Sequence, residues 1–221
     1  MRSNRLRAAV SAIAAFLLFC VFTLAVATVD VQPIGPNGSS VGLATLNGAF
    51  ARLVGTNSFW YHVSELLGIF MFLVPLCFAA LGLCQLIRRR NPLKIDSDLL
   101  LLGVFYVVVI AFYVAFDHFI INYRPVLIDG VLEPAYPSSH TMISLSVMGS
   151  AILQVRRRFP RTPLCRLVTP LLSAIMIITA MARALSGVHW LTDIVGGVLL
   201  AGVIMGVLSL LGVSAFGAIG G

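Results

Sequence analysis

Six long apolar segments constrain this 221-residue chain more than any other feature of its sequence. A helix needs about 20 mostly apolar residues to cross the hydrocarbon core of a bilayer. Lipid cannot form hydrogen bonds with exposed backbone N–H and C=O groups, and the alternation of apolar and polar residues typical of barrel strands is absent. Each segment is therefore predicted to be a helix. The segments run near residues 8–29, 60–87, 98–121, 138–155, 166–183 and 190–213.

Composition agrees with a membrane protein, because 59% of the residues are hydrophobic and only 10% are charged. A soluble domain of this size cannot bury so much apolar surface. No polar linker, low-complexity tract or internal repeat divides the chain. We therefore predict an all-α polytopic membrane protein: one domain over residues 1–221, with six transmembrane helices in one bundle.

The basic residues predict how this bundle is oriented. Twelve of the 15 Lys and Arg residues would lie on one side of a six-helix arrangement: Arg2, Arg5, Arg7, Arg88, Arg89, Arg90, Lys94, Arg156, Arg157, Arg158, Arg161 and Arg166. The positive-inside rule assigns that side to the cytoplasm. Both termini are then cytoplasmic, and the connections at 30–59, 122–137 and 184–189 face outward from the cytoplasmic (plasma) membrane. Because this topology accounts for the net charge of +7, nucleic acid is not an expected partner.

The N-terminal part of the chain admits alternative interpretations. The first apolar segment ends near Ala25-Val26-Ala27, a pattern typical of signal-peptide cleavage. Its apolar core exceeds the roughly 7–15 residues typical of a signal peptide, so we favour an uncleaved helix. The first outward connection contains a shorter apolar stretch, Val41 to Val54, interpreted as a partial interfacial helix. We favour the interpretation that this stretch caps the bundle. The alternative is that it forms a lid over the site or a wall along which lipid enters.

The other two outward connections concentrate polar side chains. These connections and the helix ends beside them carry Arg124, His140, Arg183, His189 and Asp193. Asp193 lies one turn into an apolar helix, where a carboxylate is costly and usually has a partner. If the helix includes position 189, His189 and Asp193 are spaced i, i+4 on one face. The carboxylate can then accept a hydrogen bond from the Nδ1–H of the imidazole, which fixes the tautomer and leaves Nε2 as a free nucleophile.

His140 lies at the start of the fourth apolar segment, in the stretch YPSSHT. Pro137 interrupts any regular secondary structure that precedes it, and Ser138 or Ser139 can cap the helix that follows. The start of a helix offers unpaired backbone N–H groups to an anion, and His140 in its first turn could donate a proton. Glu65, near the outer end of the second segment, faces either this site or the lipid head groups.

Two arginines, two histidines, a carboxylate and a helix N-terminus on one membrane face suit the transfer of a phosphoryl group. Guanidinium groups orient phosphate oxygens, one histidine attacks the phosphorus atom, and the other protonates the leaving oxygen. The predicted outward-facing site comprises residues 117–140 and 183–193.

These residues resemble the type 2 phosphatidic acid phosphatase superfamily, whose signature is Lys-x6-Arg-Pro, Pro-Ser-Gly-His and Ser-Arg-x5-His-x3-Asp. The chain reads DHFIINYRP, PSSH and ARALSGVHWLTD in the same order. The resemblance implies that His189 forms a phosphohistidine, that Asp193 orients His189, and that His140 is the general acid. It further implies that the phosphate is held by Arg124, Arg183, Ser138 and Ser139, and that neither a metal ion nor another cofactor is needed.

The chain departs from the family signature at three positions. Asp117 replaces the family lysine, and His118, about 100° further round a helix, is the nearest candidate to substitute for that cation. Asp117 is expected to face elsewhere or to pair with an arginine. Ser139 replaces the glycine of the second block, and Ala182 replaces the serine of the third.

The predicted function is hydrolysis of a lipid phosphate monoester or diphosphate, with the site on the extracytoplasmic face. The expected partner is a membrane lipid that carries the phosphate, because the outward connections are short and leave the site at head-group depth. The alternatives are a lipid-to-lipid phosphotransferase that uses the same phosphohistidine, or a non-catalytic protein that binds or transports lipid phosphates.

Overall fold

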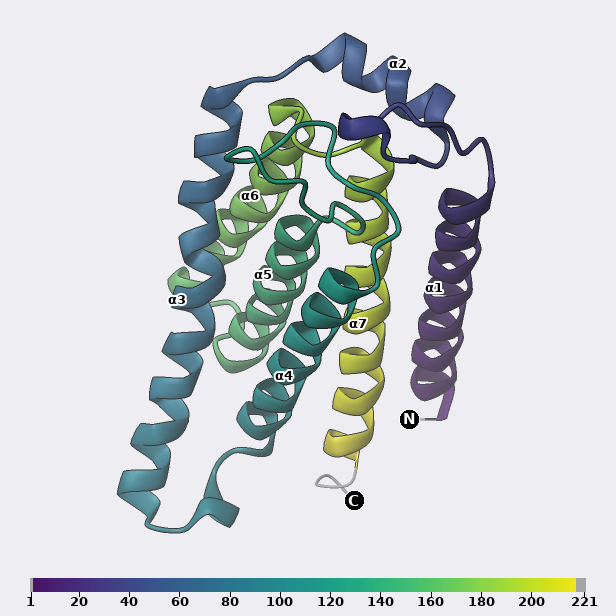
Figure 1. The fold of residues 1–221 in the computed structure, drawn as a ribbon. Helices are drawn as coiled ribbons and strands as arrows, with labels where there is room; N and C mark the ends of the chain where they lie inside the picture. The colour runs from purple at the N-terminus through teal and green to yellow at the C-terminus, as the bar shows by residue number, and fades with distance from the viewer. Residues whose placement is uncertain (1, 218–221) are drawn as a thin grey trace.

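The computed structural model of this protein describes residues 2–217, which form a bundle of long helices (Figure 1). The α-helices are α1 (Arg2–Thr28), α2 (Ala44–Val54), α3 (Ser58–Arg89), α4 (Ser97–His118), α5 (Ser139–Arg158), α6 (Pro163–Ser186) and α7 (Leu191–Gly217). Short 3₁₀ turns occur at Pro36–Gly38 and Pro92–Lys94. The described residues contain no β-strand, so the all-α prediction is confirmed.

Each predicted span corresponds to one long helix, but five of these helices are both long and apolar enough to cross a membrane: α1, α3, α4, α6 and α7. The helix that falls outside this set is α5, the fourth predicted span. It carries Ser144, Ser146, Ser150 and Gln154, all of them buried. Because α5 packs against α3, α4, α6 and α7, these polar groups face protein and not lipid. The low hydropathy of α5 therefore reflects its position inside the bundle.

The connections fall at two opposite ends of the bundle. Figure 1 shows the links α1–α3, α4–α5 and α6–α7 at one end, which we call the loop end. The start of α1, the end of α7 and the α3–α4 and α5–α6 links lie toward the other end. The structure thus groups the connections as the sequence predicts, while the assignment of the loop end to the outside stays a prediction from the basic residues.

The stretch Val41 to Val54 contains α2, which lies across the loop end in Figure 1. Its Asn47 is fully buried; the side-chain amide donates to the carbonyl of Gly42 at 2.8 Å and contacts Oγ1 of Thr192 at 2.9 Å. In return, the backbone N–H of Thr192 donates to Oδ1 of Asn47 at 3.2 Å. Leu46 and Leu53 are exposed on the other side of the helix. These contacts place α2 as a cap on the first turn of α7.

Both ends of α5 are tied to neighbouring helices. At the loop end, the backbone N–H of Ser138 donates to the carbonyl oxygen of Asp193 at 2.9 Å. At the opposite end, the Arg158 guanidinium contacts Asp96 at 3.2 Å and Asp98 at 2.6 Å. The position of α5 along the bundle is therefore determined by a hydrogen bond to α7 and by ion pairs to the start of α4.

Two glycines let α7 approach the chain that leads into α5. A Cβ atom at Gly196 would lie 2.5 Å from the ring of Tyr136, and one at Gly197 would lie 2.8 Å from the backbone oxygen of Ser138. The Tyr136 side chain is buried, and its hydroxyl lies 2.7 Å from Oγ1 of Thr23 on α1. Burial raises the pKa of Tyr136 to about 12, so its hydroxyl stays protonated. Close packing on α7 therefore holds the segment that precedes α5.

We predict that Gly197→Ala lowers the thermal stability of the protein, because the new methyl group meets backbone that cannot rotate away. Overpacking of this kind costs about 1–3 kcal/mol, or roughly 2–10 °C in melting temperature for a chain of this size. The measurement is thermal unfolding of purified protein in detergent. Gly202→Ala on the same helix is the matched control, since a Cβ atom there meets nothing within 4 Å. Equal melting temperatures for the two variants would contradict the packing argument.

Candidate active site

The polar residues singled out in the sequence come from different elements that meet at the loop end. Arg183 lies in the last turn of α6, and His189 lies in the short connection that follows. Asp193 lies in the first turn of α7, and His140 lies in the first turn of α5. Arg124 comes from the long connection between α4 and α5. The site therefore depends on how the ends of three helices are packed together.

Gly187 turns the chain from α6 toward His189. It caps α6 in the left-handed conformation, with φ of 68°. A Cβ atom at this position would lie 1.8 Å from the backbone oxygen of Gly55, in the link between α2 and α3. Only glycine satisfies both the positive φ and this close approach. The sharp turn lets His189 follow the end of α6 after two residues.

The His189–Asp193 pair is formed, although not as two positions on one helix. The helix α7 begins at Leu191, so His189 precedes it. Asp193 accepts a hydrogen bond from the backbone N–H of Trp190 at 2.8 Å, in the way that a third-position carboxylate caps a helix start. The same oxygen, Oδ2, lies 3.5 Å from Nδ1 of His189. The helix cap thus brings the carboxylate to the imidazole.

His189 is placed to act as a neutral nucleophile. The side chain is almost fully buried, and Asp193 is completely buried. Burial lowers the pKa of His189 well below its ordinary value, and the positive charges of Arg124 and Arg183 lower it further. Both ring nitrogens are buried and make no hydrogen bond within residues 2–217, and Nδ1 is the one that lies 3.5 Å from the Asp193 carboxylate. With Nδ1 facing a carboxylate, Nε2 is the nitrogen that is available to attack phosphorus.

Arg183 is held by α3 and keeps donors free. Its guanidinium is 1% exposed, and Nη2 donates to Oε1 of Glu65. The group also lies over the ring of Tyr61, 5.3 Å from the ring centroid. Nε and Nη1 are buried and have no hydrogen-bond partner in the described part of the chain. These unpaired donors can bind two oxygens of a phosphate.

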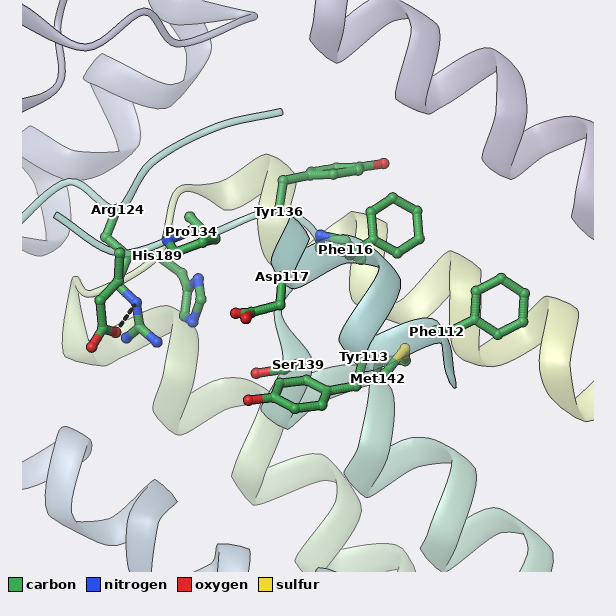
Figure 2. A pocket seen from close by; sticks show the side chains of 13 residues that line it. Phe112, Tyr113, Phe116, Asp117, Arg124, Pro134, Tyr136, Ser139, Met142 and His189 are labelled. Atoms are coloured by element: carbon green, nitrogen blue, oxygen red, sulfur yellow. Dashed lines mark ion pairs between the residues drawn. The ribbon is translucent and has the colours of Figure 1, made fainter. Parts of the chain in front are cut away.

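Arg124 is held in a different way, by the connection on which it lies. Its Nε lies 3.1 Å from Oε2 of Glu133, the ion pair dashed in Figure 2, and its backbone N–H donates to the carbonyl of Glu133 at 3.0 Å. The guanidinium lies beside His189 in the same view. Glu133 therefore aims a second guanidinium group at the nucleophile.

Ser138 and Ser139 have separate roles at the start of α5. Ser138 is the N-cap residue, fully buried, with its N–H bonded to Asp193 and its Oγ accepting from the hydroxyl of Thr141 at 3.1 Å. Its side chain makes no capping hydrogen bond. Ser139 lines the cavity beside His189. The first intrahelical bond is made by Met142, so the amides at 139–141 have no carbonyl partner within the helix.

A cavity of about 250 Å³ is lined by three of the predicted site residues, Arg124, Ser139 and His189, whereas His140, Arg183, Asp193 and Ser138 are not among its lining residues. One wall is aromatic, formed by Phe112, Tyr113, Phe116 and Tyr136. The polar part contains Asp117, Arg124, Glu133, Ser139 and His189 (Figure 2). An apolar wall beside buried cationic and nucleophilic groups suits an amphiphile that carries a phosphate.

The structure corrects two expectations about the end of α4. Asp117 does not face elsewhere or pair with an arginine: it lines the cavity, and its carboxylate is turned toward the side that carries His189 (Figure 2). His118 is exposed, its Nδ1 lies 2.9 Å from the carbonyl of Val114, and it is not among the lining residues. The 100° step between adjacent helical positions explains both findings, because only one of the two residues can face the cavity.

Three residues of the site were not assigned to it from the sequence: Tyr61, Glu65 and Glu133. Glu65 bonds Arg183, and its Oε1 also lies 3.4 Å from Nε2 of His140. A lone carboxylate within an apolar helix was the available signal, since such a group usually has a partner. Nothing in the sequence predicts that Glu65 contacts residues more than 70 positions away.

Among the described residues, no group of three or more His, Cys, Asp or Glu side chains is arranged to hold a metal ion.

Comparisons with known proteins agree with the geometry. A family model described as the PAP2 superfamily matches residues 106–215, which confirms the resemblance seen in the motifs. The crystal structure of a transmembrane PAP2-type phosphatidylglycerolphosphate phosphatase from Bacillus subtilis has the same fold, with a TM-score of 0.58 and 18% sequence identity. That match covers 96% of this chain and 98% of the other. No curated protein matches the sequence significantly.

We predict that His189 stays neutral at pH 6, with its proton on Nδ1. Because the pKa of His189 is lowered, its neutral form persists to a lower pH than that of an ordinary histidine, whose pKa is about 6.5. The measurement is ¹⁵N NMR of histidine-labelled protein in detergent micelles, with the signal assigned through His189→Gln. Protein unfolded in denaturant is the reference and should titrate normally. A folded-state titration of His189 at or above pH 6.5 would refute the prediction.

Proposed function

We propose that this chain, which belongs to the PAP2 superfamily, is an integral membrane phosphatase that hydrolyses the phosphate monoester or diphosphate of a lipid through a phosphohistidine. One observation carries the proposal: a buried histidine faces a carboxylate, is influenced by the positive charges of two arginines, and lines a cavity with an aromatic wall. The fold shared with a membrane phosphatase supports the same reaction class.

In the first step, Nε2 of His189 attacks phosphorus, and the bond from phosphorus to the leaving oxygen breaks. His140 donates a proton to that oxygen, so the lipid leaves as an alcohol or as a lipid monophosphate. Asp193 stabilises the positive charge that develops on the His189 ring. Arg124 and Arg183 bind the equatorial oxygens, with the first amides of α5 near Ser139 as further donors.

In the second step, a water molecule attacks the phosphohistidine from the side that the alcohol has left. His140 now removes a proton from this water, the phosphorus–nitrogen bond breaks, and inorganic phosphate is released. His189 returns to its neutral form and His140 to its protonated form. The charges that stabilise both steps come from the two guanidinium groups, so the proposed reaction requires no metal ion.

The substrate is proposed to be a lipid because the cavity combines an aromatic wall with phosphate-binding groups at the end of a membrane bundle. In the proposed topology α5 also crosses the membrane, which gives six spans in all; both termini are cytoplasmic, and the site faces the extracytoplasmic side of the plasma membrane. The positive-inside rule supports this orientation. A phosphate group carried by a membrane lipid then lies at the depth of the loop end.

We predict that purified protein in detergent releases phosphate from phosphorylated lipids, equally with and without EDTA. His189→Ala should lower kcat by about 10⁴-fold or more, because the covalent route is lost. His118→Ala is the matched control: it should leave kcat and KM within about twofold, since His118 lies outside the cavity. Activity that survives His189→Ala would refute the phosphohistidine. Transfer of phosphate to a second lipid without its release would identify a phosphotransferase, and binding without turnover a non-catalytic protein.

Asp117 should weaken phosphate binding, because its carboxylate lines the cavity that receives the phosphate. Repulsion between two charges near a protein surface is on the order of 1 kcal/mol, or roughly fivefold in affinity. We therefore predict that Asp117→Asn lowers KM by about that factor, and less so at high salt. Steady-state kinetics at two ionic strengths measure the effect. A higher KM in the variant would instead show that Asp117 binds a donor group of the substrate.

A further inference from the structure

Glu65 on α3 contacts two of the residues of the site that carry positive charge during the first step, Arg183 and His140. Its Oε1 bonds Nη2 of Arg183 and lies 3.4 Å from Nε2 of His140. Among the described residues, no other carboxylate lies within ion-pair distance of either side chain. Glu65 also lies outside residues 106–215, the part of the chain that the PAP2 family model matches.

The imidazole of His140 has a defined orientation against α3. A Cβ atom at Gly68, one turn after Glu65, would lie 3.6 Å from both Cδ2 and Nε2 of His140. The Nε2 edge of the ring therefore packs on α3, between Gly68 and the carboxylate of Glu65. The other nitrogen, Nδ1, is buried and makes no hydrogen bond within residues 2–217. Nδ1 is thus the nitrogen of His140 that remains available for a proton transfer.

The same face of α3 supports Arg183. Tyr61 and Glu65 are spaced i, i+4, and the guanidinium lies over the Tyr61 ring while it bonds the Glu65 carboxylate. A guanidinium that is 1% exposed needs a counter-charge, because an unpaired buried charge costs several kcal/mol. One helical face, formed by Tyr61, Glu65 and Gly68, thus positions the general acid and one phosphate-binding arginine together.

We propose that Glu65 is the positioning residue of the general acid, an inference that rests on the phosphatase function proposed above. The carboxylate accepts a hydrogen bond from the Nε2–H of His140 and stabilises the imidazolium, while the proton stays on Nε2. Nδ1 of His140 then gives its proton to the leaving oxygen as the phosphorus–oxygen bond breaks. His140 is left neutral, with its remaining proton on Nε2 facing Glu65. In the second step, Nδ1 accepts a proton from the attacking water, which restores the imidazolium.

This role predicts that the effect of Glu65 depends on the leaving group. An alkyl alcohol needs a proton as it leaves, and general acid catalysis contributes roughly 10²–10⁴-fold to such a step. A nitrophenolate leaves without a proton. Glu65→Gln, which keeps shape and removes charge, should therefore lower kcat for a lipid phosphate monoester by about 10²-fold. For 4-nitrophenyl phosphate the same variant should lose less than about threefold in kcat, because the glutamine oxygen still accepts a hydrogen bond from Arg183 and a weaker hold on that guanidinium raises KM on both substrates.

The experiment measures kcat and KM of detergent-purified wild type, Glu65→Gln, His140→Ala and the double variant on both substrates. His140→Ala should show the same dependence on the leaving group, and the double variant should be no slower than His140→Ala alone, because Glu65 acts through His140. Glu65→Asp should recover part of the lost kcat. Asp129→Asn is the matched control for loss of a carboxylate, since this exposed residue of the α4–α5 connection forms no ion pair with Arg183 or His140 among the described residues.

Three outcomes would overturn the proposal. Equal losses of kcat on both substrates would show that Glu65 has only a structural role. In the double variant, a loss of kcat that adds to that of His140→Ala would show that Glu65 does not act through His140. A lower KM with unchanged kcat would show that Glu65 only competes with the phosphate for Arg183. Wild type that hydrolyses neither substrate would instead refute the phosphatase function itself, so the two failures are distinguishable.

Discussion

The first turn of α7 is the part of the molecule on which the candidate site depends. Asp193 caps this turn through Trp190, faces Nδ1 of His189 with the same oxygen, and accepts the N–H of Ser138 with its backbone carbonyl. One buried residue therefore links the proposed nucleophile to the start of α5, where His140 and Ser139 lie. The glycines at 196 and 197 permit this contact, because any side chain there would push α5 away.

Charge balance explains the carboxylates that surround the two arginines. Burying a guanidinium without a partner is costly, so Glu65 and Glu133 each hold one; Arg124 also lines the cavity, and Arg183 keeps two buried donors without a partner in the described part of the chain. Asp117 differs, because no ion pair holds it among the described residues and it faces the cavity. The site thus combines positive groups that are fixed in place with one negative group at the position where the family signature has a lysine.

The helices could be predicted well from the sequence, and the contacts between them could not. Apolar segment length located each long helix to within a few residues, since a span must match the bilayer thickness. The central place of α5 was not predicted, although its buried serines and Gln154 agree with it in retrospect. The structure was also needed to decide whether Asp117 or His118 lines the cavity, because a rotation of the helix by 100° would exchange the two positions.

Local spacing and hydropathy, which the chain carries without reference to its fold, were enough to predict the class of protein and the order of the three motifs. They were also enough to propose the site residues Arg124, His140, Arg183, His189 and Asp193. The fold was needed to show that Glu65 contacts both His140 and Arg183, and that Glu133 pairs with Arg124. Glu65 lies more than 70 residues from both of its partners, and packing of α3 on α5 and α6 alone brings them together.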